Sequence, residues 1–174
     1  TQSSGFPQNL PPSGGGGSIV FMYIRKEAVL SSQIEGTQAS LMDVLEFESE
    51  VLDEPNPRDV EEVINYVSAM NQGLQRLESL PLSLRLIREI HSELLKGVRG
   101  SERNPGEFRA TQNWIGPKGC TLATAKFVPP PVHEMHRGLD NLEKFFYYDD
   151  SFMPALVKIG LIHAQFETIH PFLD

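Results

Sequence analysis

The last stretch of the chain, residues 161–174, reads LIHAQFETIHPFLD. It predicts an amphipathic helix that runs into a His-Pro-Phe turn. Because proline disfavours helical geometry at the residue before it, we expect the helix to end near Ile169 or His170. The His170 imidazole then stands at a helix end where it can reach solvent, while Phe172 and Leu173 fold back onto the core. Asp174 follows four residues later, close enough to share a site with His170.

Apolar residues recur at helical spacing through most of the chain before this stretch. The pattern predicts about six helices, which begin near Ile19, Ser40, Pro57, Ser83, Pro131 and Pro154. Residues 97–131 are different, because they hold Gly and Pro without a helical period. Two short runs of β-forming residues, 111–115 and 121–128, flank a Gly-Pro-Lys-Gly turn and predict one β-hairpin. The expected fold class is therefore mainly α, with one β-hairpin.

The composition limits the classes of function. A net charge of -8 over 174 residues argues against a broad nucleic-acid-binding surface on this segment. No apolar run approaches the roughly 20 residues of a membrane span, and no secretory leader is evident. The single cysteine, Cys120, excludes an internal disulfide framework and fits a reducing compartment. We therefore expect a cytoplasmic protein without a nucleic-acid or membrane partner here, and the sequence leaves a homodimer open.

The first helix closes at residues 31–36, SSQIEG. Gly36 is expected to cap it, since glycine accepts the left-handed conformation at little cost. Glu35 then lies in or just past the last turn, where the helix dipole opposes a carboxylate by about 0.3–1 kcal/mol. One interpretation is a solvated surface glutamate. The other is a cationic partner elsewhere in the protein, with Ser31 one turn earlier on the same face.

Several stretches resemble the Fic family, in the right order along the chain. Residues 170–174, HPFLD, resemble the start of its signature, His-Pro-Phe-x-Asp/Glu-Gly-Asn-Gly-Arg-x-x-Arg, and residues 31–36 resemble its inhibitory motif, Ser/Thr-x-x-x-Glu-Gly/Asn. Residues 106–116, GEFRATQNWIG, and 127–131, FVPPP, also resemble this family. The resemblance runs from near Met22 to Asp174. It implies a Fic-type helical bundle in which the β-hairpin is a flap.

The resemblance also implies a domain organisation. Residues 1–18, rich in Gly, Pro, Ser, Gln and Asn, would be a flexible leader or linker. Residues 19–53 would be an N-terminal region with the inhibitory helix, and residues 54–174 the Fic catalytic core. Only the first five residues of the signature are present, so the core would be incomplete at its C-terminal side. We accordingly expect the chain as given to fold at least in part without transferring AMP.

The activity that the resemblance implies is that of a protein adenylyltransferase, which transfers AMP from ATP to a Ser, Thr or Tyr hydroxyl of a target protein. His170 would be the general base, and Asp174 would bind Mg²⁺ or Mn²⁺. Glu35, with Ser31 and Gly36 in the inhibitory motif, would pair with the second arginine of the signature and exclude the γ-phosphate. The nucleotide site would thus include Glu35, His170 and Asp174. The flap that docks the target would be formed by Thr121, Leu122, Ala123 and Thr124.

Three other functions stay open on the sequence. The same site could remove AMP from a modified protein, with Glu35 activating a water. A metal-dependent hydrolase could use His163, His170 and Asp174. The third alternative is a helical interaction module without activity.

Overall fold

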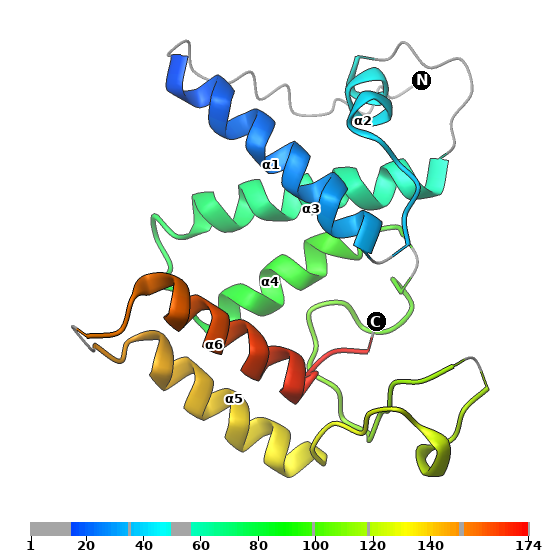
Figure 1. Cartoon of the computed structure of the whole chain (residues 1–174), viewed down its shortest axis with the longest axis vertical. Coiled ribbons are helices and arrows are strands. Elements are labelled where there is room, and N and C mark those ends of the chain that lie inside the picture. The colour runs from blue at the N-terminus through cyan, green and yellow to red at the C-terminus, as the bar shows by residue number, and fades with distance from the viewer. Residues whose placement is uncertain are drawn as a thin grey trace, which may run out of the picture. The chain divides into compact units, whose positions relative to one another are not determined.

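The computed structural model describes residues 15–34, 36–49, 57–98, 100–117, 119–149 and 152–173. The chain forms two compact units, residues 1–67 and residues 68–174, and the division falls inside helix α3 (Pro57–Arg76). The described residues form six α-helices and one short 3₁₀-helix (Figure 1). The mainly helical fold class is therefore confirmed. None of the described helices combines the length and the apolar character needed to cross a membrane.

The first unit is built from α1 (Gly15–Ile34), α2 (Leu41–Glu48) and residues 57–67 of α3. α2 begins as predicted at Ser40. The Ser40 hydroxyl accepts the amide of Asp43, and the Asp43 carboxylate accepts the amide of Ser40, which is a capping box. Short side chains from the helices and from the α1–α2 connection form the buried core: Ala28, Val29, Ala39, Val44, Val60, Val63 and Val67.

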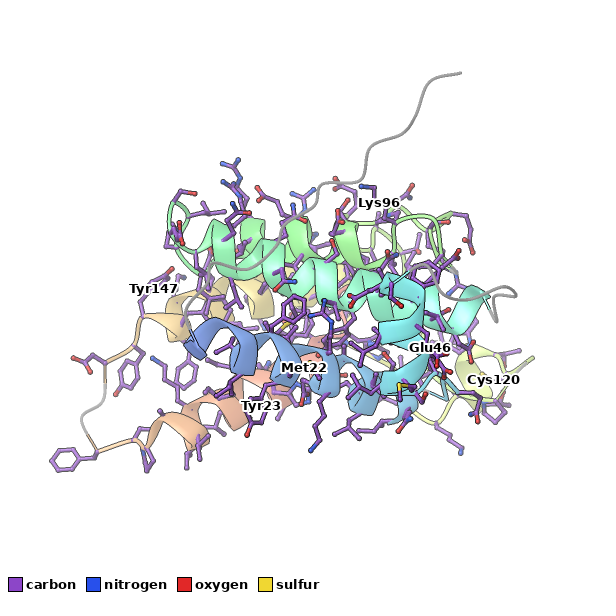
Figure 2. All side chains as sticks on the ribbon, turned by 90° about the horizontal axis from the view of Figure 1, so that it is seen from above. Met22, Tyr23, Glu46, Lys96, Cys120 and Tyr147 are labelled. Carbon is purple, nitrogen blue, oxygen red and sulfur yellow. The ribbon has the colours of Figure 1, made fainter. Side chains whose placement is uncertain are left out.

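An ion pair joins α1 to α2 within this unit. The Arg25 guanidinium donates from Nε and Nη2 to the two carboxylate oxygens of Glu48, at 2.9 and 2.6 Å. It also lies over the ring of Phe21, 3.1 Å from the centroid. Because Arg25 is buried, the bidentate geometry offsets the loss of water around its charge. The two residues that follow Phe21 in α1, Met22 and Tyr23, are exposed (Figure 2).

The second unit holds the remainder of α3, then α4 (Leu84–Leu94), α5 (Val132–Phe146) and α6 (Ala155–Ile169). α4 begins as predicted after Ser83, whose hydroxyl accepts the amide of Leu86. α5 and α6 lie side by side (Figure 1), and their shared core contains Met135, Leu139, Leu142 and Ile169. Residues 95–131 connect α4 to α5 without an α-helix among the described residues.

The predicted β-hairpin is not confirmed. Among the described residues of 111–128, the two runs meet at a single antiparallel bridge between Ile115 and Phe127. Leu122–Thr124 forms the 3₁₀-helix η1 in place of a strand. The physical reason is local, because the Thr124 hydroxyl accepts the Thr121 amide at 2.9 Å and so offers this backbone an alternative to ladder pairing. The predicted boundary between residues 53 and 54 lies outside the described residues and stays a prediction.

Gly106 should be intolerant of a side chain, for two reasons. Its φ is +82°, and a Cβ there would stand 2.9 Å from the main-chain oxygen of Arg88. We expect Gly106→Ala to lower the free energy of unfolding by more than the roughly 1–2 kcal/mol of the left-handed conformation alone. The control is Gly97→Ala, since Gly97 has φ +72° and open space around it. Urea denaturation measures both, and equal losses would contradict a role for the close approach to Arg88.

Candidate functional site

The C-terminal end of α6 presents His170 in an unusual backbone conformation. The His170 amide donates to the Phe166 carbonyl at 2.9 Å, and the residue itself is left-handed, with φ 43° and ψ 68°. The prediction that the helix ends near Ile169 or His170 is thus confirmed. A left-handed residue other than glycine costs roughly 1–2 kcal/mol, so the surroundings must hold it in place. Among the described residues only Asn104 shares a positive φ without being glycine.

Residues after His170 anchor the turn. Phe172 is buried, as predicted, and Leu173, which was predicted to fold back with it, is half-buried. Pro171 is buried as well. The Phe172 ring stacks on the His91 ring, with centroids 3.7 Å apart and planes 5° from parallel. Phe108 packs against the same ring at 5.2 Å. Because aromatic side chains bury large areas in fixed geometry, these contacts fix the chain immediately after His170.

His91 is buried on α4, which agrees with a structural role for a histidine on an apolar helix face. Its Nδ1 accepts the amide of Gly106 at 2.8 Å. The Gly106 carbonyl in turn accepts the Nε of Arg88 at 2.6 Å. An accepting Nδ1 leaves the ring proton on Nε2, so this hydrogen bond selects one neutral tautomer. α4 and the Gly106 loop therefore support the Phe172 side of the turn together.

Arg109 is the residue that sequence reasoning did not single out. It is only 2% exposed, and its guanidinium donates to the carbonyls of His170 (Nε, 2.9 Å), Pro130 (Nη2, 2.5 Å) and Thr111 (Nη1, 3.2 Å). Its amide donates to the Pro171 carbonyl at 2.8 Å. Burial lowers the pKa of Arg109. The only sequence signal was its place within residues 106–116, which carry part of the family resemblance.

The other predicted site residues fall only partly within the described residues. His170 is half-buried, whereas Asp174 and Glu35 lie outside the described residues. Gly36, with φ +99°, caps α1 as predicted. The Gly36 amide donates to Gln33 and the Thr37 amide to Ser32, which are the two hydrogen bonds of a Schellman motif. The prediction that Ser31 and Glu35 lie near His170 stays a prediction.

The Ser31 hydroxyl has a hydrogen-bond partner within its own helix. It donates to Oε1 of Glu27 at 2.9 Å, one turn earlier on α1. On α6, His163, which the alternative of a metal-dependent hydrolase would use, is exposed. No three His, Cys, Asp or Glu side chains within the described ranges lie close enough to hold a metal ion.

The proposed flap residues Thr121, Leu122, Ala123 and Thr124 are all exposed, on and just before η1. The Trp114 indole donates to the Cys120 carbonyl at 3.1 Å, which ties the two arms of this loop together near its end. The Ile115–Phe127 bridge closes the loop at its base. The loop thus presents short, exposed main-chain segments on a closed scaffold.

The left-handed backbone of His170 leads to a stability prediction. His170→Gly and His170→Ala remove the same imidazole, but only alanine keeps a Cβ that opposes the left-handed conformation. We expect the glycine variant to be more stable than the alanine variant by roughly 1 kcal/mol. Thermal or urea denaturation of the pair gives the difference. An alanine variant as stable as the glycine variant would show that the turn relaxes to another conformation.

Comparison with known proteins gives the family. A model described as "Fic/DOC family N-terminal" matches residues 8–75, and one described as "Fic/DOC family" matches residues 81–174. The second match lies within the resemblance found from the sequence, and the first begins before it, at residue 8.

Two solved structures share the fold. A Fic family protein from Desulfovibrio desulfuricans G20 matches with a TM-score of 0.67 at 21% identity, over 96% of this chain and 46% of its own. A Fic domain containing signaling protein from Bacteroides thetaiotaomicron VPI-5482 matches with a TM-score of 0.70 at 18% identity, over 96% of this chain and 62% of its own. The chain therefore spans about half to three fifths of the length of these two proteins. Since the Fic/DOC model alone covers more than half of the residues, this chain belongs to the Fic/DOC family.

Proposed function

We propose that this protein transfers AMP from ATP to a hydroxyl side chain of a target protein, with His170 as the general base. Family membership supports a function of this kind. The observation that carries the assignment to His170 is its place at the end of α6, in a turn whose following residues are buried. The imidazole is half-buried, so it combines a held backbone with access to a substrate.

The proposed chemistry is a single displacement at phosphorus. The target hydroxyl oxygen forms a bond to the α-phosphorus of ATP, and the bond from that phosphorus to the bridging oxygen breaks, releasing pyrophosphate. The hydroxyl proton passes to His170, since histidine is the usual base near neutral pH. Such reactions need little covalent chemistry from the protein, because positioning and charge stabilisation supply most of the rate. A base fixed by a rigid turn suits that requirement.

ATP is the proposed substrate, and Mg²⁺ or Mn²⁺ is the proposed cofactor. Asp174 would hold the ion, and its carboxylate is the donor type that these cations prefer. Magnesium takes one or two protein carboxylates and completes its shell with water and phosphate oxygens, so one aspartate beside bound nucleotide is sufficient. The bound ion would neutralise charge on the phosphates.

The proposed location is the cytoplasm, because a single cysteine favours a reducing compartment.

The proposed docking site for the target is the exposed segment Thr121–Thr124. Beyond the Ile115–Phe127 bridge, an extended target segment could pair with main chain that no ladder uses. Such pairing recognises the main chain of the target more than its side chains. It therefore suits the docking of a short segment around the modified hydroxyl. In this proposal the flap has the family role without being a regular hairpin.

Inhibition by Glu35 is also a proposal. A carboxylate and a phosphate both suit a bidentate arginine, so Glu35 and the γ-phosphate would compete for one partner. The Schellman motif at Gly36 supports this role, because it ends α1 at a defined place directly beside Glu35 in the sequence.

The main test measures AMP incorporation from α-labelled ATP into the proteins of a cell extract, using the natural full-length protein. We expect Glu35→Gln to raise incorporation severalfold and His170→Ala to reduce it to background. Glu46→Gln is the matched control, since it removes the same charge from the neighbouring helix α2 (Figure 2). Unchanged transfer in Glu35→Gln would refute inhibition. Release of AMP from modified proteins, with no incorporation by any variant, would favour the reverse reaction.

Metal dependence can be tested in the same assay. We expect a chelator to abolish transfer and added Mg²⁺ or Mn²⁺ to restore it, because the phosphates need a cation in the transition state. Asp174→Ala should lower turnover far more than it lowers the melting temperature. Full activity in the presence of the chelator would remove the metal from the mechanism.

A further inference from the structure

The buried guanidinium of Arg109 donates hydrogen bonds to main-chain carbonyl groups. Its guanidinium donates hydrogen bonds to the carbonyls of His170, Ile169, Pro130 and Thr111, at 2.9, 3.4, 2.5 and 3.2 Å. Burying a charge is unfavourable unless hydrogen bonds replace its lost water. Nε and both terminal nitrogens of Arg109 find such partners, so the side chain is a satisfied buried cation and not a solvated one.

These partners converge on the turn that carries His170. Ile169 is the last residue of α6, and His170 and Pro171 follow it directly. The last carbonyls of a helix lack intrahelical partners and carry the negative end of its dipole. Arg109 supplies donors to two of them from its side chain and to the Pro171 carbonyl from its amide. It therefore acts as a cationic cap for α6, supplied by a distant loop.

The hydrogen bond to the His170 carbonyl also bears on the strained conformation. In a left-handed residue the carbonyl leaves the direction of the helix axis, and at ψ 68° it meets Nε of Arg109 at 2.9 Å. A helical His170 would point this carbonyl elsewhere and lose the bond. The backbone torsions of His170 set where its Cβ, and hence the imidazole, projects from the end of α6.

We propose that Arg109 is the positioning residue of the catalytic base, holding His170 in the left-handed conformation from which its imidazole meets the target hydroxyl. The proposal rests on the proposed function of His170. Arg109 contacts main chain and acts on the reaction through His170. Phe172, stacked on His91, fixes the other side of the same turn.

Arg109→Lys is the informative variant. Lysine keeps the positive charge at the end of α6, but its single ammonium group cannot reproduce a planar fork that reaches Thr111, Pro130 and His170 together. We expect the turnover number of AMP transfer by the natural full-length protein to fall roughly ten- to hundredfold, as for a misplaced catalytic group. The KM for ATP should change less than the turnover number, because Arg109 itself contacts main chain and not the nucleotide in this proposal.

A second readout does not need activity. The chain has five histidines, so the imidazole signals of a histidine-labelled sample can be assigned by the loss of one set in His170→Ala. We expect Arg109→Lys to change the chemical shifts of the His170 imidazole in the nuclear magnetic resonance spectrum. If the wild-type protein transfers no AMP, the proposed function of His170 fails, while this spectrum still decides whether Arg109 sets the conformation of the turn.

Two controls separate positioning from stability. Arg137→Lys makes the same chemical change on the exposed face of α5, where Arg137 pairs with Glu134. Leu142→Ala weakens the core of the same unit, one turn beyond Gly138, the residue that packs against Ile169. Both controls should leave the His170 signals in place, and Leu142→Ala should lower the melting temperature without the loss of turnover.

The proposal is overturned if Arg109→Lys loses no more turnover than Leu142→Ala at a comparable melting temperature, or if the His170 signals do not move. Arg109→Gln, which keeps an amide donor without the charge, is the second variant if the lysine variant does not fold. Failure of both to fold would show that Arg109 serves the whole unit and not the base, and would also overturn the proposal.

Discussion

A buried guanidinium holds together the segments that surround the His170 turn. Arg109 reaches the end of α6, the Thr111 carbonyl beside it in sequence, and the Pro130 carbonyl just before α5. Each of these carbonyls would otherwise be a main-chain acceptor without a ladder or helix partner, which is unfavourable away from water. One planar side chain satisfies them together, so the loop from α4 to α5 is tied to α6 by hydrogen bonds rather than by a sheet.

The contacts of Phe172 extend this arrangement to α4. The ring stacks on His91, and the hydrogen bond from the Gly106 amide holds the His91 ring in turn. Arg109 and Phe172 act on opposite ends of the same short turn, one through main-chain carbonyls and one through ring packing. Backbone strain persists where the surroundings over-determine it, and His170 meets that description. This architecture is what makes a general-base role for His170 chemically reasonable.

The flap shows how local chemistry can override a strand-forming pattern. Residues 121–128 carry threonine and aromatic side chains that favour strands, yet the Thr124 hydroxyl accepts the Thr121 amide, and the backbone forms η1 instead. Only Ile115 and Phe127 pair across the described part of the loop. An isolated two-stranded ribbon is marginal in any case, so little free energy separates a hairpin from this bridged loop.

The sequence by itself determined the helices of this protein and much of its proposed site. Capping by Ser40 and Ser83, the prolines before α5 and α6, and the apolar stripes are local signals, because helix formation depends on neighbours within four residues. The His-Pro-Phe motif likewise located the end of α6 and His170. The tertiary structure alone decided the left-handed conformation of His170, the stacking of Phe172 on His91 and the role of Arg109. These depend on carbonyls and rings as many as 61 and 81 residues away along the chain, and no periodicity or short motif encodes which distant groups will meet.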